Sequence, residues 1–125
     1  MYRYLNFALF SALLAAAALL GQPRAALAAA HDGVWSVLII TEQGTCDRGY
    51  RYEVKVANGH VTYDGGADVN LAGTVSPDGA IKVSIKLGEN GASGTGHLSA
   101  HSGAGVWRGI GANGSCAGRW EAELR

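Results

Sequence analysis

Hydrophobic residues beyond position 33 alternate with polar ones along short segments, and turn residues interrupt the alternation about every ten positions. A period of two is typical of a β-strand with one buried face. No segment of this region repeats apolar residues at helical spacing. We therefore predict an all-β domain with eight strands, over residues 34–41, 50–57, 60–64, 68–76, 80–87, 92–99, 104–110 and 116–124.

Turn residues predict how neighbouring strands are paired. Asn58-Gly59 is a strong signal for a two-residue hairpin, because both positions require positive φ. It predicts Val56 opposite Val61 and Val54 opposite Tyr63. In the same way, the sequence Pro-Asp-Gly at 77–79 predicts a three-residue turn between the fourth and fifth strands.

The sixth strand carries glycine on its inward face, and glycine weakens a strand unless a neighbour covers it. We expect a four-residue loop over 100–103, which would place Trp107 opposite Gly96. The indole would then lie over bare glycine backbone.

Cys46 and Cys116 are the only two cysteines. We predict that they form a disulfide, worth about 4 kcal/mol for a loop of this length in the chain-entropy model. A metal pair is the alternative, but the local Cys/His spacing of zinc sites is absent. The pair would lie at one end of neighbouring first and last strands. This favours an antiparallel up-and-down meander closed into a small barrel, with a two-sheet sandwich as the alternative.

The first thirty residues resemble a secretory signal peptide, with Arg3 before an apolar run and small residues ending at Ala30. A membrane helix is the alternative, but the run is too short to span a bilayer. We therefore expect an exported protein, periplasmic or extracellular, cleaved after Ala30 or Ala28. Residues 31–125 would then form a single domain with no membrane span.

The domain is mildly acidic, since residues 31–125 hold ten Asp and Glu but eight Lys and Arg. A nucleic-acid partner would require a basic face, so none is expected. The four histidines are His31, His60, His97 and His101. None is predicted to lie inside with an acid and a nucleophile, so no catalytic site, metal or cofactor is expected. His97 and His101 could bind a metal or haem weakly, or be solvated.

Six aromatic residues are predicted to point inward, and they form either a packed core or a ligand cup. The tyrosines are the better ligand candidates, because each brings a hydroxyl that needs a partner. The six are Trp35, Tyr50, Tyr52, Tyr63, Trp107 and Trp120.

The connection at 42–49 is predicted to be the longest and to be tethered by the disulfide. It places Asp47, Arg48 and Arg51 at one rim. Such a rim suits protein recognition. It could equally be a solvated connector.

Two groups of motifs carry a resemblance. Gly33-x-Trp35, Cys46-Asp47-Arg48-x-Tyr50-Arg51-Tyr52 and Cys116-x-Gly118-x-Trp120 together resemble an uncharacterised family of small exported alphaproteobacterial β proteins. That resemblance implies export and a β domain but no activity. Some proteins of that family carry automatic labels of haem use or adhesion. The opening Gly-x-Trp is also similar to calycin-type eight-stranded barrels, such as lipocalins, avidins and the periplasmic metalloprotease inhibitor.

Together these features predict a monomeric, non-enzymatic binding module for a small ligand or an envelope protein. The alternatives are a periplasmic or secreted protease inhibitor and, less directly, a haem-related or adhesion role. An exported enzyme would need an acid, base or metal inside the barrel, which the sequence does not offer.

Overall fold

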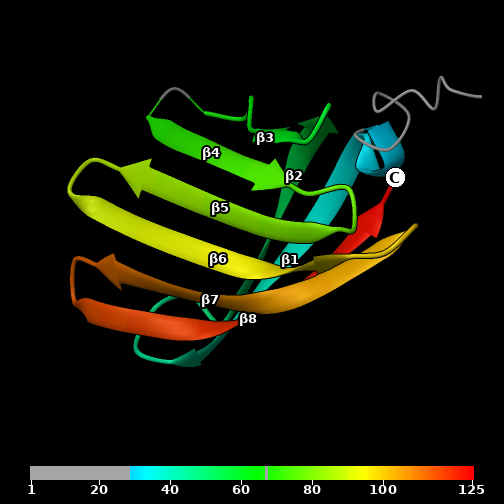
Figure 1. Cartoon of the computed structure of the whole chain (residues 1–125). Helices are drawn as coiled ribbons and strands as arrows, with labels where there is room; N and C mark the ends of the chain where they lie inside the picture. The colour runs from blue at the N-terminus through cyan, green and yellow to red at the C-terminus, as the bar shows by residue number, and fades with distance from the viewer. Residues whose placement is uncertain (1–28, 67) are drawn as a thin grey trace, which may run out of the picture.

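The computed structural model describes residues 29–66 and 68–125. A 3-10 turn, η1 (Ala29–His31), precedes eight antiparallel strands that pair in sequence order, and β8 closes the ring by pairing with β1 (Figure 1). The predicted all-β meander and closed barrel are therefore confirmed, and the sandwich is excluded. The predicted signal peptide lies outside the described residues, apart from its last two. The strands are β1 (Gly33–Gln43), β2 (Gly49–Ala57), β3 (His60–Thr62), β4 (Val69–Val75), β5 (Ala80–Leu87), β6 (Asn90–Leu98), β7 (Ser102–Gly111) and β8 (Gly114–Leu124).

The two turns with specific turn residues form as predicted. Asn58 and Gly59 have φ of 51° and 77°, and Val56 lies opposite Val61. Gly79, the last residue of the β4–β5 turn, has φ of 99°. These left-handed backbone angles are the ones that Asn and Gly tolerate best, so the turn residues set the pairing.

The prediction for β3 was too long. The strand ends at Thr62 rather than at residue 64, and the expected pair of Val54 with Tyr63 does not form. An Asp-Gly-Gly sequence follows Tyr63, and these residues favour turns over strands. The connection at 63–68, rather than the one after β1, is consequently the longer of the two.

The predicted register of β6 with β7 was wrong, because it differs by two residues from the observed one. The loop spans only residues 99–101 and is closed by the Ser99 N–H, which donates to the Ser102 carbonyl at 2.7 Å. Trp107 therefore lies opposite Gly94, whereas Gly96 lies opposite Gly105. Strands rich in glycine and serine specify their register weakly, which accounts for the error.

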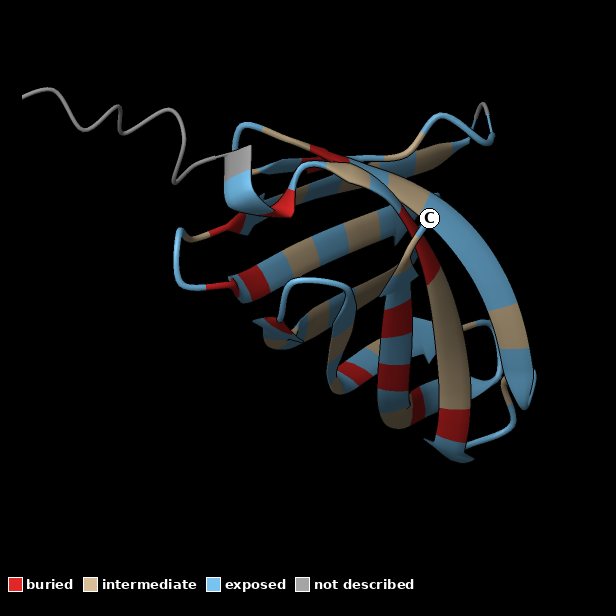
Figure 2. Ribbon diagram, turned by 90° about the vertical axis from the view of Figure 1, so that its right-hand side faces the viewer, coloured by how far each residue is buried: buried red, intermediate tan, exposed pale blue. Residues whose placement is uncertain are grey.

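Buried and exposed residues alternate along the strands (Figure 2). The least exposed apolar side chains lie at one end of the barrel. Trp35, Val56, Val61 and Leu98 are each at most 2% exposed, with Val75 and Ile81 at 7%. We call this end the base. It contains most of the buried core, which continues through Trp107, Trp120 and Cys116 toward the opposite end.

The turns at the base are linked by hydrogen bonds, each to the end of a neighbouring strand. Val75 N–H donates to the Gly59 carbonyl at 2.8 Å, and Leu98 N–H donates to the Gly79 carbonyl at 2.8 Å. Leu124 N–H donates to the His101 carbonyl at 2.9 Å. These bonds join the turns at the base into one linked set. We call the opposite end, with the β1–β2, β3–β4, β5–β6 and β7–β8 connections, the mouth.

In the described part of the chain, no helix has the length and apolar character that a membrane crossing requires.

Candidate ligand-binding site

The half of the barrel nearer the mouth contains an apolar cavity of about 260 Å³. It begins above the buried residues of the base and extends to the mouth, since residues from both regions line it. Its walls include Val37, Ile39, Tyr50, Tyr52, Leu71, Val83, Ile85, Leu87, Asn90, Ala92, Gly94, Trp107, Gly109, Ile110 and Trp120. The interior is thus a cup, which is filled by side chains at the base and open at the mouth.

The cavity exists because neighbouring strands carry inward side chains of different size. The inward row of β5 holds the large aliphatic residues Ile81, Val83 and Ile85. The next two strands, β6 and β7, hold the small residues Ala92 and Gly109 beside Ile85 in the ring. Since the barrel's circumference is fixed by eight strands, the missing side-chain volume on one wall leaves a hollow.

Two of the three Gly-x-Trp units pair with each other across β7 and β8. Trp107 lies opposite Gly118, and Trp120 lies opposite Gly105. Each indole crosses the facing strand: Trp107 Nε1 donates to the Ile40 carbonyl on β1, and Trp120 Nε1 donates to the Thr95 carbonyl on β6, both at 3.1 Å. The repeated motif is therefore a structural device that binds four strands together.

Gly96 on β6 and Gly105 on β7 lie opposite each other, and the indole of Trp120 on β8 covers both. A Cβ at Gly105 would lie 2.6 Å from Trp120 Nε1, and one at Gly96 would lie 2.5 Å from its Cζ2. We expected an aromatic ring over Gly96 and assigned it to Trp107. Covering by an indole is confirmed, but the residue is Trp120, because of the two-residue shift in register.

The third unit lies at the base. Trp35 is 1% exposed, and its Nε1 donates to the His31 carbonyl at 2.9 Å, which holds η1 against the barrel. The aromatic set therefore divides: the tryptophans are 1–9% exposed, whereas Tyr50 and Tyr63 are half-buried and Tyr52 is 39% exposed.

Three tyrosine rings form a cluster on the β2 side of the mouth. The ring centroids of Tyr50 and Tyr52 are 5.1 Å apart, and those of Tyr52 and Tyr63 are 5.8 Å apart, both in edge-to-face geometry. Burial, followed by the neighbouring Tyr52 and Asp47, raises the pKa of Tyr50. Burial, followed by Tyr63 and Asp47, raises the pKa of Tyr52. These hydroxyls therefore stay protonated as potential hydrogen-bond donors at neutral pH.

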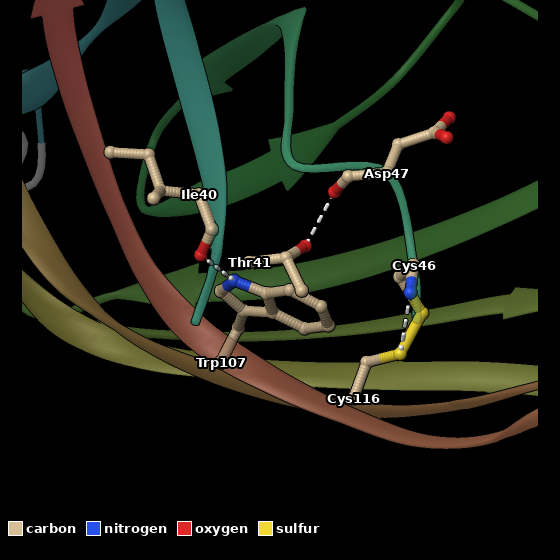
Figure 3. Close-up of a disulfide and its surroundings, with 6 residues drawn as sticks. All are labelled: Ile40, Thr41, Cys46, Asp47, Trp107 and Cys116. Atoms are coloured by element: carbon tan, nitrogen blue, oxygen red, sulfur yellow. Dashed lines mark hydrogen bonds between the residues drawn. A yellow bond between two sulfur atoms is a disulfide. The ribbon is translucent and has the colours of Figure 1, made fainter. Parts of the chain in front are cut away.

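The disulfide lies at the mouth (Figure 3). Cys46 and Cys116 are bonded, with their Cα atoms 6.2 Å apart, as predicted. Cys46 N–H lies 3.2 Å from Cys116 Sγ, and Thr41 Oγ1 donates to the Asp47 carbonyl at 2.6 Å. Cys46 also lines the cavity, so the cross-link holds the β1–β2 loop as part of its wall.

The predicted rim residues lie at different places around this loop. Asp47 and Arg48 are exposed within it, directly after Cys46. Arg51 lies on β2, opposite Leu38, and its Nη1 is 3.4 Å from Ser36 Oγ on the outer wall of the barrel. Asp47 and Arg48 therefore border the mouth, as predicted for the rim, whereas Arg51 packs along the outside of the barrel.

Sequence reasoning missed the aliphatic part of the mouth. Leu87 is 46% exposed and Ile110 is 65% exposed, and both border the cavity together with Tyr52. These three are among the five large hydrophobic residues exposed in the described chain. Leu87 was predicted to face inward as part of β5. Its position at the last residue of that strand was the available signal that it would reach the rim.

The four histidines lie at different places. His60 is exposed on β3, His97 is exposed on β6, His101 is exposed in the β6–β7 loop, and His31 is buried at the base. Across residues 29–66 and 68–125, no three His, Cys, Asp or Glu side chains are grouped so that they could hold a metal ion.

Comparison of the chain with family models, with curated proteins and with solved structures gives no match.

Proposed function

We propose that this barrel binds a small apolar molecule in its cup and acts as a non-enzymatic binding module of the cell envelope or the surrounding medium. The observation that carries the proposal is the apolar cavity of about 260 Å³ that opens at the mouth. Concave, largely apolar sites with a few polar groups are the usual form of small-molecule sites.

The size of the cup limits the ligand. At about 30 Å³ per water-sized group, the cavity holds about eight or nine such groups, so a short alkyl chain or a single aromatic ring system fits. Exposed Leu87 and Ile110 at the rim extend the apolar surface beyond the cavity. A somewhat longer ligand would therefore still contact apolar surface where it leaves the barrel.

The rigidity of the site also supports binding. The disulfide fixes the β1–β2 loop at the mouth, and the reciprocal tryptophan pairs fix the β7–β8 wall. A preformed site loses less conformational entropy when a ligand enters, so more of the contact energy appears as affinity.

Export is the setting that best suits these features. A disulfide persists in oxidising compartments, and the predicted signal peptide would deliver the chain there. Detection of the protein in periplasmic or culture-medium fractions, with an N-terminus at residue 29 or 31, would test this part of the proposal.

A protease inhibitor is less well supported. Inhibitors of this shape would need the segment before the first strand to enter an enzyme's cleft. The described part of that segment, η1, is instead held to the base by the bond from Trp35 to His31.

The direct test is titration with the neutral probe N-phenyl-1-naphthylamine, whose fluorescence rises in apolar surroundings. We expect saturable binding at micromolar concentrations, with a matching change in the emission of Trp107 and Trp120, which line the cup. No saturable binding by this probe or by neutral alkyl probes would overturn the proposal.

A further inference from the structure

The mouth of the cup carries a cluster of tyrosine rings and several acidic residues, which binding of an apolar chain in the cavity would not need. Tyr50 and Tyr52 line the cavity, and Tyr63 stacks edge-to-face on Tyr52 from the next connection. The two ring pairs have interplanar angles of 78° and 77°. Edge-to-face contact packs the three rings against one another, so an ammonium group would lie against their outer faces, where the negative ring face attracts a cation.

Charged residues in the mouth connections have a strong sign preference. Asp47 lies in the β1–β2 loop, Asp64 and Asp68 lie between β3 and β4, and Glu89 lies in the β5–β6 turn; all four are exposed. Arg48 is the one basic residue among the described residues of these connections and the β7–β8 turn. A mouth with this sign concentrates cations and repels anions near the cavity.

The polar groups inside the site are donors or acceptors without a positive charge. The lining contains the tyrosine hydroxyls and the Asn90 amide, and it contains no lysine, arginine or histidine. An anionic head group that entered the mouth would therefore meet no cation in the wall. A cationic head group would meet aromatic faces and carboxylates.

We infer that the ligand of this cup is a small amphiphilic cation, with its apolar chain in the cavity and its ammonium group between the tyrosine rings and the acidic mouth. This inference rests on the proposed function, since the chain occupies the same cup. It specifies the head group, which the cavity alone leaves open.

The test compares three probes with the same ten-carbon chain: decyltrimethylammonium, decyl sulfate and decyl maltoside, all below their micelle concentrations. At low salt we expect the ammonium probe to bind about tenfold more tightly than the sulfate probe, with the neutral maltoside between them. The difference should shrink as salt rises to about 0.5 M, because exposed charges are screened.

Two variants separate the tyrosine cluster from general surface charge. Tyr52→Leu keeps an apolar side chain but removes the ring between the other two, so it should weaken the ammonium probe severalfold more than it weakens the maltoside. Asp47→Asn should also weaken binding of the ammonium probe, because it removes a negative charge from the mouth. Glu123→Gln removes the same charge from the exposed outer wall of β8 and should leave all three affinities unchanged.

The outcomes distinguish the two proposals. Equal affinity for the ammonium and sulfate probes, or tighter binding of the sulfate, would overturn the cation inference while the apolar cup survives. Equal loss of affinity for all three probes in Tyr52→Leu would show that the tyrosine rings do not bind the ammonium group. No binding by any probe would overturn the proposed function as well.

Discussion

Trp107 lies directly opposite Gly118 in the β7–β8 pair, and its indole N–H reaches across that glycine to the Ile40 carbonyl on β1. The reverse pair, Trp120 opposite Gly105, reaches β6 in the same manner. A Cβ at either glycine would collide with the backbone of the strand beyond it. Both glycines are therefore needed for close approach, and the spacing of the Gly-x-Trp unit follows from antiparallel register.

Replacing Gly105 with alanine should destabilise the barrel by about 2 kcal/mol, because the added methyl overpacks a filled site. It would contact the Thr95 carbonyl and Trp120 Cε2, the latter at 2.6 Å. The matched control is Gly94→Ala, one strand away, where the nearest atom is 3.5 Å from the new Cβ. Urea unfolding measures both. Equal free energies of unfolding for the two variants would show that close packing by the indole is not what requires glycine.

Filling the cup should abolish ligand binding and leave the fold intact. Ala92 points into the cavity from the small-residue wall, so Ala92→Leu should reduce the affinity for N-phenyl-1-naphthylamine at least tenfold. Thermal stability should stay the same or rise, since the side chain occupies empty space. Val106→Leu, on the outer wall where the residue is 60% exposed, is the control. Retention of full probe affinity by Ala92→Leu would place the binding site elsewhere.

Loss of the disulfide should affect both stability and binding. The double variant Cys46→Ser/Cys116→Ser should lower the free energy of unfolding by about 4 kcal/mol, as expected for a cross-link that closes a loop of this length. Because Cys46 lines the cavity, the freed β1–β2 loop should also weaken probe binding. Reducing agent should reproduce the effect in the natural protein and add nothing in the variant. An unchanged probe affinity in a folded variant would show that the loop is not part of the site.

Alkaline pH should destabilise the barrel through the mouth tyrosines. The pKa of Tyr50 and that of Tyr52 are raised in the fold, mainly by burial, so the folded state favours the neutral form. That stabilisation is complete below the unfolded value of about 10 and is lost as pH rises through the raised pKa values. The free energy of unfolding should therefore fall between about pH 9 and pH 12. The decrease should be smaller in Tyr50→Phe/Tyr52→Phe. An identical decrease in both proteins would contradict this assignment.

The sequence predicts the parts of this fold where residue type alone determines backbone geometry. Asn58 and Gly59 fixed the β2–β3 register through positive φ, and Cys46 with Cys116 placed the first and last strands side by side. The β6–β7 register was predicted wrongly, since serine and glycine around residues 99–103 fit more than one pairing.

The cup could be predicted only as one of two alternatives. Tyr50 and Tyr52 were expected on the inner face, and both line the cavity. Whether that space is filled depends on summed side-chain volumes around the whole ring, which no single strand reveals. The exposure of Ile110 and Leu87 at the rim depends on where each strand ends relative to its neighbours, and strand ends are the least certain part of a sequence-based prediction.

Strand order has a consequence for how the chain folds. Every pairing joins strands adjacent in sequence, except that between β1 and β8. The hairpins therefore form through short-range contacts, and the entropic cost of a long-range contact is concentrated in a single ring-closing event. The Trp107–Ile40 bond and the disulfide both span that closure. We therefore expect ring closure to limit the folding rate, and oxidation before folding to accelerate it.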